Sequence, residues 1–319
     1  MRYVVYGAGA VGGVIGGRLH LSGVPVTLVC RGDHLLAIRR NGLLLNTPSG
    51  TYVIDAPSAA GAADIDWSPD TVVLLCVKSQ DTAAALADLR AHAPADTVVV
   101  SVQNGTANED LILRCFARTY SAWVLVPANH LHPGVVVQRA VQVPGIVDIG
   151  RYPDAIDDIA IAISSDLAAA TFSSAARADI TACKRRKLIA NLSNGIDAIC
   201  RPGAAADELV ALAQSEAEEV YAKLGVPVIT AAADSERRGT YLRRRGDPDI
   251  PDRSSTWQSL SRGTSVEVDY LNGEIVFLGR LCGISTPVNE LVQTTVRAMA
   301  RINSTPGSID PAELLARLT

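Results

Sequence analysis

One lysine and two asparagines lie on the same side of an expected helix in the segment CKRRKLIANLSNG, residues 183–195. Lys187, Asn191 and Asn194 are spaced i, i+4 and i+7, and a helix turns by about 100° per residue, so the three side chains form one narrow stripe. The other side carries the apolar residues of the segment, Leu188, Ile189, Leu192 and Ile196. A single cation between neutral amides differs from the usual spread of Glu and Lys on a solvated helix face, and it therefore points to chemistry.

This stripe has the composition of a site that reduces a carbonyl group. Hydride transfer to a carbonyl carbon places negative charge on the oxygen, and a positioned lysine can stabilise that charge and donate the proton, an effect of about 10²–10⁴-fold. Asparagine amides can hold a substrate hydroxyl or carboxylate without pairing with the ammonium. The alternative is a lysine at a helix end that directs its charge into solvent, after the basic residues Lys184, Arg185 and Arg186.

A glycine-rich turn follows the first expected strand and precedes an amphipathic helix. Gly7, Gly9 and Gly12 complete the pattern GxGxxG: the first permits a tight turn, the second lets the backbone approach a pyrophosphate, and the third lets helix and strand pack closely. Backbone N–H groups at the start of the helix then face the phosphates. We therefore expect a dinucleotide-binding domain whose cofactor contacts come from the whole turn, Gly7, Ala8, Gly9, Ala10, Val11 and Gly12.

The end of the second expected strand selects between NAD and NADP. An NAD-binding domain usually carries Asp or Glu there, roughly 20 residues after the glycines, to bind the ribose hydroxyls. Cys30 and Arg31 occupy this place, and an arginine can bind a 2′-phosphate through two hydrogen bonds. We expect NADP (NADPH) as the cofactor, while Asp33, two residues further on, keeps NAD as the minority interpretation.

Two further expected strands, residues 71–77 and 96–102, each end in a cluster of polar residues. Ligands bind at the carboxyl ends of parallel strands in such sheets. The candidates for binding cofactor or substrate are therefore Lys78, Gln80, Gln103 and Asn104. Because Asn104 precedes a glycine, a plain turn is the alternative interpretation at that position.

The first half of the chain ends in a β-rich stretch, residues 121–150, which prolines and glycines divide. His130 and His132 in this stretch have a spacing that metal sites use. No third ligand is evident in the sequence, so we expect no metal.

Past about residue 178 the strand pattern disappears and helical patterns follow. The expected helices cover residues 182–199, 204–223, 254–262, 266–282, 287–303 and 310–318. The charged segment 235–253, with its arginine-rich stretch 237–245, is interpreted as a solvated helix end and a loop. The chain is thus expected to form an α/β Rossmann-type dinucleotide-binding domain over residues 1–178 and an all-α domain over residues 179–319.

Composition and charge exclude several classes of protein. The 319 residues carry a net charge of −4, which argues against nucleic acid or an anionic membrane as the partner. No apolar run reaches the ~18 residues of a membrane span, and the N-terminus enters a strand without a signal-peptide pattern. The six cysteines are scattered without a CxxC pair, as the buried thiols of an intracellular protein are. We expect a cytoplasmic protein with neither disulfides nor a zinc site.

Several short motifs together resemble the ketopantoate reductase (2-dehydropantoate 2-reductase) family. They are GAGAVGG, LVCRG, CVKSQDT, QNG, PGVV, RKLIAN, SSTWQS, EVDYLNGEIV and GISTPVN, and they span essentially the whole chain. The resemblance implies a Rossmann domain followed by a helical domain of the 6-phosphogluconate dehydrogenase type. It also implies NADPH-dependent reduction of a 2-oxo acid to a 2-hydroxy acid, with 2-dehydropantoate, an intermediate of pantothenate biosynthesis, as the first candidate.

The resemblance assigns roles to individual residues. Lys187 matches the catalytic lysine of the family and Glu267 its active-site glutamate. The remaining matches are the substrate-binding residues Asn104, Asn191 and Ser255, and the cofactor-binding residues Arg31, Lys78 and again Asn104. Glu267 is also expected to open the helix over residues 266–282, where a carboxylate in the first turn is favourable for the helix dipole. Asp269 and Glu274 are interpreted as surface or capping groups.

The chain departs from the family pattern near the expected site. The family often has a second asparagine two turns past the lysine, a place that Gly195 occupies here. We expect the preceding Asn194 to reach the ligand from another side and Gly195 to leave extra room. The sequence STWQS, which replaces a more usual one, adds to this difference. Reduction of another small 2-oxo acid, or of an opine-type imine, is therefore the alternative within the family.

A different class of function is a non-catalytic module that senses NADP(H). The presence of both Lys187 and Glu267 disfavours it, because a sensor needs neither residue. The expected partner is a small 2-oxo acid. A homodimer is a further option, since the helical domain offers a surface for one, although no exposed apolar stripe is evident from the sequence.

Overall fold

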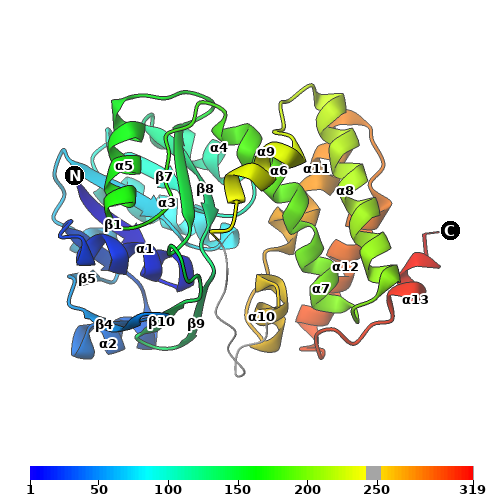
Figure 1. Cartoon of the computed structure of the whole chain (residues 1–319), viewed down its shortest axis with the longest axis horizontal. Coiled ribbons are helices and arrows are strands. Elements are labelled where there is room, and N and C mark those ends of the chain that lie inside the picture. Colours follow the sequence, from blue (N-terminus) through cyan, green and yellow to red (C-terminus); the bar gives the residue numbers. More distant parts are fainter. Residues whose placement is uncertain (242–252, 319) are drawn as a thin grey trace. The chain divides into compact units, whose positions relative to one another are not determined.

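The computed structural model describes residues 1–241 and 253–318, which divide into two compact units (Figure 1). The first unit consists of Met1–Gln103, Asn108–Cys183 and a segment that begins at Ala231. The second consists of the loop Asn104–Ala107, the segment Lys184–Thr230 and the C-terminal helices.

The first unit is built on a seven-stranded sheet with the strand order β11-β8-β7-β6-β1-β2-β5. Its strands are β1 (Arg2–Tyr6), β2 (Val26–Val29), β5 (Ser58–Ala59), β6 (Thr71–Leu75), β7 (Val98–Ser101), β8 (Thr119–Leu125) and β11 (Ile146–Arg151). Neighbouring strands are parallel except for β8 and β11. The carboxyl ends of the parallel strands therefore share one edge, which is the ligand-binding edge of such sheets.

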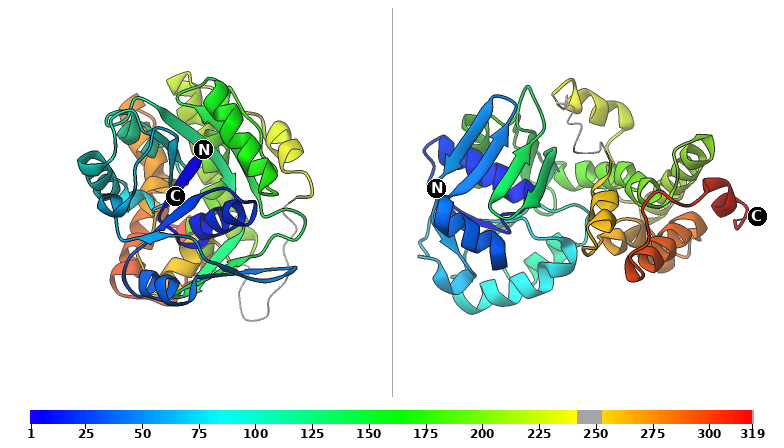
Figure 2. Two further views of the ribbon diagram at one scale, coloured as in Figure 1. Left: turned by 90° about the vertical axis from the view of Figure 1, so that its left-hand side faces the viewer. Right: turned by 90° about the horizontal axis from the view of Figure 1, so that it is seen from below.

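Both sides of this sheet are apolar and covered. Successive residues of a strand face opposite sides, so Tyr3 and Val5 join one core cluster while Val4 and Tyr6 join the other. Helices lie on both sides of the sheet (Figure 2). Helices α1 (Ala10–Leu21) and α5 (Asp158–Ala169) contribute residues to the first cluster, and α3 (Thr82–His92) and α4 (Asn108–Leu113) contribute residues to the second. The α/β fold predicted for the first half is confirmed.

A smaller sheet, with the strand order β4-β3-β10-β9, completes the first unit. Its strands are β3 (Leu43–Thr47), β4 (Gly50–Ile54), β9 (Ala128–His132) and β10 (Val135–Gln138), and α2 (Gly32–Asn41) precedes them. Glycines let α1 approach this sheet closely, because a Cβ on Gly13 would lie 2.7 Å from Cγ1 of Val136, and one on Gly17 would lie 3.0 Å from Cδ2 of Leu45.

The second unit contains helices and turns in its described part. The helices that contribute to it are α6 (Ile180–Asn191), α7 (Ser193–Ile199), α8 (Ala204–Leu224), α10 (Ser255–Ser261), α11 (Asn272–Cys282), α12 (Pro287–Arg301) and α13 (Pro311–Leu315). Apolar residues of these helices, except α10, meet in one core that includes Leu209, Ile275 and Val292. The all-α prediction for this part is confirmed. Among the residues that the structure describes, no helix is long and apolar enough to cross a membrane.

Two expected helices are interrupted. The helix expected over 182–199 consists of α6 and α7, with Leu192 between them in the right-handed helical conformation (φ −61°, ψ −25°). The amide of Asn272 donates to the carbonyl oxygen of Leu192 at 3.3 Å, so the start of α11 is hydrogen-bonded to the residue between the two helices. The helix expected over 266–282 starts with the 3₁₀ turn η3 (Val268–Tyr270), and α11 follows. Glu267 therefore precedes a turn and does not open a helix.

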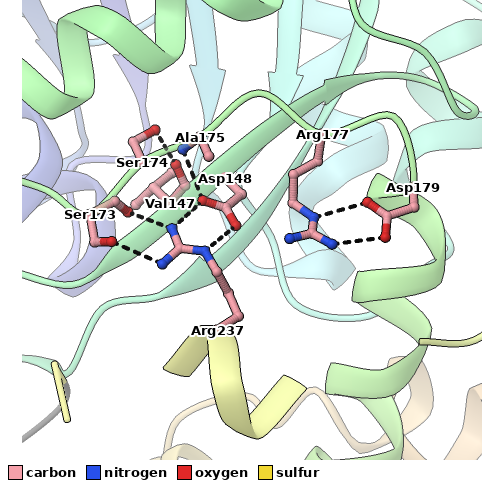
Figure 3. A network of polar contacts seen from close by, with 8 residues as sticks. All are labelled: Val147, Asp148, Ser173, Ser174, Ala175, Arg177, Asp179 and Arg237. Atoms are coloured by element: carbon pink, nitrogen blue, oxygen red, sulfur yellow. Dashed lines mark hydrogen bonds and ion pairs between the residues drawn. The ribbon is translucent and has the colours of Figure 1, made fainter. Parts of the chain in front are cut away.

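Helix α9 (Ala231–Arg238) has no counterpart among the expected helices and belongs to the first unit. Its Arg237 donates through Nε and Nη2 to the two carboxylate oxygens of Asp148, at 2.8 and 2.5 Å, and through Nη1 to Oγ of Ser173 at 2.9 Å (Figure 3). Asp148 lies on β11 and is completely buried. The interpretation of residues 235–253 as solvated is therefore wrong for Arg237, and its part from 242 to 252 lies outside the described residues.

All six cysteines are free. Burial raises the pKa of the Cys30 and Cys200 thiols to about 11. Burial also raises the pKa of Cys183 to about 12, although the nearby charge of Arg177 opposes the shift. These thiols stay protonated near neutral pH and lack the thiolate that nucleophilic or redox chemistry needs.

Candidate active site

Lys187 and Asn104 are joined by a hydrogen bond within the second unit. The Nζ of Lys187, on α6, donates to Oδ1 of Asn104 at 2.7 Å. Lys187 is only 7% exposed, so the alternative of a lysine directed into solvent does not hold. A neutral amide orients the ammonium without cancelling its charge, which is the arrangement that stabilisation of a developing oxyanion requires.

The loop Asn104–Ala107 is held by other parts of the second unit. Gly105 has φ +79°, and a Cβ there would lie 2.8 Å from the carbonyl oxygen of Tyr270, so glycine alone lets the loop rest on η3. Thr106 Oγ1 donates to Oε1 of Glu274 at 3.4 Å. Glu274, on α11, is only 9% exposed. Its interpretation as an ordinary surface group is therefore wrong: its carboxylate contacts the loop that carries Asn104.

Glu267 lies on the turn that supports this loop. The residue is half-buried, and its carbonyl oxygen accepts a hydrogen bond from the N–H of Tyr270 at 2.9 Å. Because Gly105 packs on the Tyr270 carbonyl, the turn that follows Glu267 and the loop that carries Asn104 are neighbours. Lys187, Asn104 and the Glu267 turn are thus connected by direct contacts, although the catalytic role of Glu267 stays a prediction.

The other predicted substrate-binding residues lie where α6, α7 and α10 begin or end. Asn191 is the last residue of α6, Asn194 lies in the first turn of α7, and both are half-buried. Ser254 Oγ donates to the carbonyl oxygen of Asn194 at 3.0 Å and accepts from the N–H of Trp257 at 3.2 Å, so it caps α10 and links it to α7. Ser255, the next residue, is exposed at the first position of α10.

Two residues that position α10 were missed by the sequence analysis. Asp197 on α7 accepts a hydrogen bond from the N–H of Ser254 at 2.9 Å and another from Nη1 of Arg253 at 2.8 Å. A serine directly before a helical pattern is a capping signal, which could have identified Ser254. No local signal identifies Asp197, because its partners are more than 50 residues away in the sequence.

Gly195 does not leave extra room, and the expectation that it enlarges the site is wrong. A Cβ on this glycine would lie 2.6 Å from Cγ1 of Val292 and 2.7 Å from Oδ1 of Asn272. Gly195 is buried, and its missing side chain lets α7 pack closely against α11 and α12. The residue therefore serves packing within the second unit.

The glycine turn of the first unit has the shape that a pyrophosphate requires. Gly7 has φ +106°, and a Cβ on Gly12 would lie 2.3 Å from the carbonyl oxygen of Gly7, so both positions need glycine for the turn itself. A Cβ on Gly9 would meet nothing within 4 Å. Gly9 also precedes α1, whose first turn is capped by no side chain. The turn thus leaves its middle and the helix start open to a ligand, and the residues present fit a dinucleotide.

Arg31 is exposed directly after β2 and before α2. Its guanidinium interacts with Tyr6, whose Oη also donates to the Asp88 carboxylate. Burial raises the pKa of Tyr6 to about 12, the bond to Asp88 adds to the shift, and the charge of Arg31 opposes it. The guanidinium is thus close to the carboxyl end of β1, on the same unit as the glycine turn.

Of the polar residues after β6 and β7, Gln103 has a structural role. Its Nε2 donates to the carbonyl oxygen of Val77 at 2.9 Å and to Oγ1 of Thr82 at 2.7 Å. It is only 4% exposed. Gln103 therefore ties together the segments that follow the two strands, while Lys78 is half-buried directly before the turn Ser79–Asp81.

His130 and His132, on β9, belong to no metal-binding cluster. In residues 1–241 and 253–318, no three His, Cys, Asp or Glu side chains come close enough together to hold a metal ion.

The covered parallel sheet with its glycine turn and the helical unit with its buried lysine define an oxidoreductase of the two-domain dinucleotide-binding class. Two family models match the chain: Ketopantoate reductase PanE/ApbA over residues 3–154 and Ketopantoate reductase PanE/ApbA C terminal over residues 179–300. The chain belongs to the ketopantoate reductase family, as its motifs predict.

Relatives of known name match over nearly their whole length. The 2-dehydropantoate 2-reductase of Pyrococcus horikoshii is 27% identical over 306 residues, covering 93% of this chain and 97% of that protein. The 2-dehydropantoate 2-reductase of Halobacterium salinarum is 28% identical over 326 residues, with coverages of 94% and 99%.

Solved structures show the same fold. A PanE/ApbA family ketopantoate reductase from Ralstonia eutropha superposes with a TM-score of 0.81 at 27% identity, covering 95% of this chain and 99% of that one. A D-mandelate dehydrogenase, in a ternary complex with NADH and anilino(oxo)acetate, superposes with a TM-score of 0.82 over the same shares of both chains, at 23% identity. At 23% identity, the similarity to the D-mandelate dehydrogenase shows a shared fold.

Proposed function

We propose that this protein reduces a 2-oxo acid to a 2-hydroxy acid with NADPH, and that the oxo acid is 2-dehydropantoate. The observation that supports this proposal best is the buried Lys187 ammonium, which donates to Asn104 at 2.7 Å. Membership of the ketopantoate reductase family supports the proposed type of reaction. The open surface at Gly9 adds a place for the dinucleotide.

The proposed roles follow from the chemistry of each side chain. A bound nicotinamide cofactor supplies the hydride. Lys187, oriented by Asn104, stabilises the negative charge that forms on the substrate carbonyl oxygen and gives it a proton. Glu267 and Asn191 bind the terminal hydroxyl of the substrate, and Ser255 binds its carboxylate. Asn194 borders the substrate.

Further residues are proposed to bind the cofactor. The turn Gly7–Gly12 and α1 bind the pyrophosphate through backbone N–H groups. Arg31 binds the 2′-phosphate of NADPH. Lys78 and Asn104 complete the set as the remaining polar contacts of the cofactor.

The direct test is to measure the loss of NADPH absorbance with a panel of 2-oxo acids, 2-dehydropantoate among them, and to repeat each assay with NADH. Turnover that is fastest with 2-dehydropantoate supports the proposal. Turnover that is faster with a different oxo acid, or with an oxo acid and an amine together, assigns the protein another substrate within the family. NADPH binding without turnover of any compound in the panel indicates a sensor.

Arg31→Ala is expected to raise the KM for NADPH by about tenfold or more, because charged hydrogen bonds to a phosphate contribute about 1.5–3 kcal/mol. The KM for NADH should hardly change, since NADH has no 2′-phosphate. Steady-state kinetics with both cofactors check the result. Equal use of NADPH and NADH by the unaltered protein contradicts the assignment of Arg31.

The unaltered protein is expected to prefer 2-dehydropantoate over the analogue without the terminal hydroxyl by about 10²-fold or more in kcat/KM, because the analogue lacks the hydroxyl that Glu267 is proposed to bind. Glu267→Ala should shrink this ratio. The matched control is Asp269→Ala, on the same turn, whose carboxylate is bonded to Gln293 and Arg297. A protein that reduces both compounds equally well has a pocket for another oxo acid.

A further inference from the structure

The Ala8 peptide in the glycine turn is fixed by a histidine from another element. The Nε2 of His34, on α2, lies 2.8 Å from the carbonyl oxygen of Ala8. On its other side, the N–H of Gly134 donates to Nδ1 of the same ring at 2.8 Å. His34 is only 9% exposed, and its ring centroid lies 4.2 Å from that of His130.

These two contacts determine which ring nitrogen of His34 carries the hydrogen. Because Nδ1 accepts a hydrogen bond from Gly134, it carries no hydrogen, and the neutral imidazole then carries its hydrogen on Nε2. Nε2–H therefore donates to the Ala8 carbonyl oxygen. The ring connects the glycine turn to the segment between β9 and β10, and the connection runs through backbone atoms of Ala8 and Gly134 at its two ends.

The orientation of Ala8 determines that of the next N–H group. In a trans peptide the carbonyl oxygen and the following N–H point in opposite directions, so the N–H of Gly9 points away from His34. The N–H of Ala8 is itself engaged, since it donates to the carbonyl oxygen of Val29 at 2.9 Å. The lack of a side chain on Gly13 leaves space for the Ala8 carbonyl, because a Cβ at this position would lie 3.2 Å from the Ala8 oxygen. A flipped Ala8–Gly9 peptide would instead present a carbonyl oxygen, which repels phosphate.

We propose that His34 is a positioning residue for the cofactor: it holds the Ala8–Gly9 peptide so that the Gly9 N–H is presented to the pyrophosphate. This inference rests on the proposed function, because it takes the glycine turn as the dinucleotide site. Gly9 is partly exposed, and a Cβ on it would meet nothing within 4 Å, so the space beside its Cα is open to a ligand. His34 itself touches no ligand in this proposal.

The test compares cofactor affinity in His34→Ala and His34→Gln with that of the unaltered protein. Titration calorimetry should show a dissociation constant for NADPH that is about 3–10-fold higher in His34→Ala, the effect of one lost hydrogen bond. In His34→Gln the affinity should be largely restored, because the amide can donate to Ala8 and accept from Gly134. The kcat at saturating NADPH should stay nearly unchanged in both variants.

A second ligand separates positioning of the pyrophosphate from general damage. Adenosine 2′-monophosphate carries the 2′-phosphate but no pyrophosphate, so its dissociation constant should be the same in His34→Ala and in the unaltered protein. His20→Ala, which removes a histidine near the other end of α1, is the matched control. Thermal denaturation shows that each variant is folded.

The outcomes distinguish this inference from the proposed function. If the unaltered protein does not bind NADPH, the proposed function fails. If it binds NADPH and His34→Ala binds it equally well, with only a lower Tm, His34 merely supports the fold and the inference is overturned. Equal weakening of NADPH and adenosine 2′-monophosphate also overturns it, because the effect is then not specific to the pyrophosphate.

Discussion

Lys187→Ala is expected to lower kcat by about 10²-fold or more while NADPH binds with unchanged affinity. The ammonium stabilises charge that exists on the substrate oxygen only in the transition state, and the loss of such an interaction lowers kcat rather than binding. The structure adds a reason to expect a large effect. Lys187 is nearly fully buried and is oriented by Asn104, so bulk water cannot easily replace it.

Two variants make this experiment specific. Lys187→Met keeps most of the buried volume without the charge, and it should lose as much activity as Lys187→Ala. Lys223→Ala removes an exposed lysine from the last turn of α8 and should leave kcat unchanged. Steady-state kinetics and an NADPH titration on each variant provide the comparison. If Lys187→Met retains most of the activity, Lys187 is not the proton donor and the proposed mechanism is wrong.

Arg237→Met is expected to destabilise the protein by about 3–5 kcal/mol, because it leaves the buried carboxylate of Asp148 without its hydrogen-bonded arginine. The Asp148 side chain is completely buried, and Arg237 forms two hydrogen bonds to it. The N–H of Ala175 also donates to Asp148 at 3.0 Å and remains in the variant. Thermal denaturation should show a Tm lower by about 6 °C or more.

Two comparisons identify the cause of this loss. Adding Asp148→Asn to Arg237→Met should recover part of the stability, because a neutral amide costs less to bury than an unpaired carboxylate. Arg280→Ala breaks an ion pair with Glu290 whose side chains are 68% and 51% exposed, and it should cost less than about 1 kcal/mol. Equal losses in Arg237→Met and Arg280→Ala contradict the importance assigned to burial.

The parts of the fold that local patterns determine could be predicted. Strand β1 alternates between two cores and is followed at once by a glycine turn, and both features are visible in the first twelve residues. The burial of Lys187 does not follow from its own helix, because Leu188 and Leu192 form the opposite, apolar side. The partner that holds it, Asn104, lies 83 residues earlier in the sequence, and the resemblance to the family placed both residues in one site.

Long-range partners account for what the sequence analysis missed. Arg237 reads as a solvated residue in a charged segment, because its partner Asp148 is 89 residues away on a buried strand. The sequence suggests that Glu274 is a surface or capping group, but its carboxylate accepts a hydrogen bond from Thr106, which is distant in the sequence. The sequence suggests that Gly195 leaves extra room in the site, whereas Val292 and Asn272 fill the space that a side chain would need. The domain boundary between residues 178 and 179 stays a prediction.

Another buried network went unnoticed for the same reason. Glu216 on α8 accepts from the backbone N–H groups of Val288 and Asn289 at 2.8 and 3.0 Å, and so caps α12 in place of a local residue. Burial raises the pKa of this carboxyl group, although the same N–H groups oppose the shift. The sequence shows only an acidic residue within a run of acidic residues, which is typical of a solvated helix.

The attachment of α9 to the first unit has a consequence for the order in which the protein is made. Synthesis proceeds from the N-terminus, so the strand that carries Asp148 is complete long before Arg237 exists. Helices α6, α7 and α8 must all be synthesised in between. Until then a nascent chain that forms this sheet must bury the Asp148 carboxylate without its hydrogen-bonded arginine or leave that part of the sheet open. The first unit therefore cannot complete its fold until α9 has been made, and a gene fragment that ends at Cys183 encodes it without the arginine that is hydrogen-bonded to Asp148.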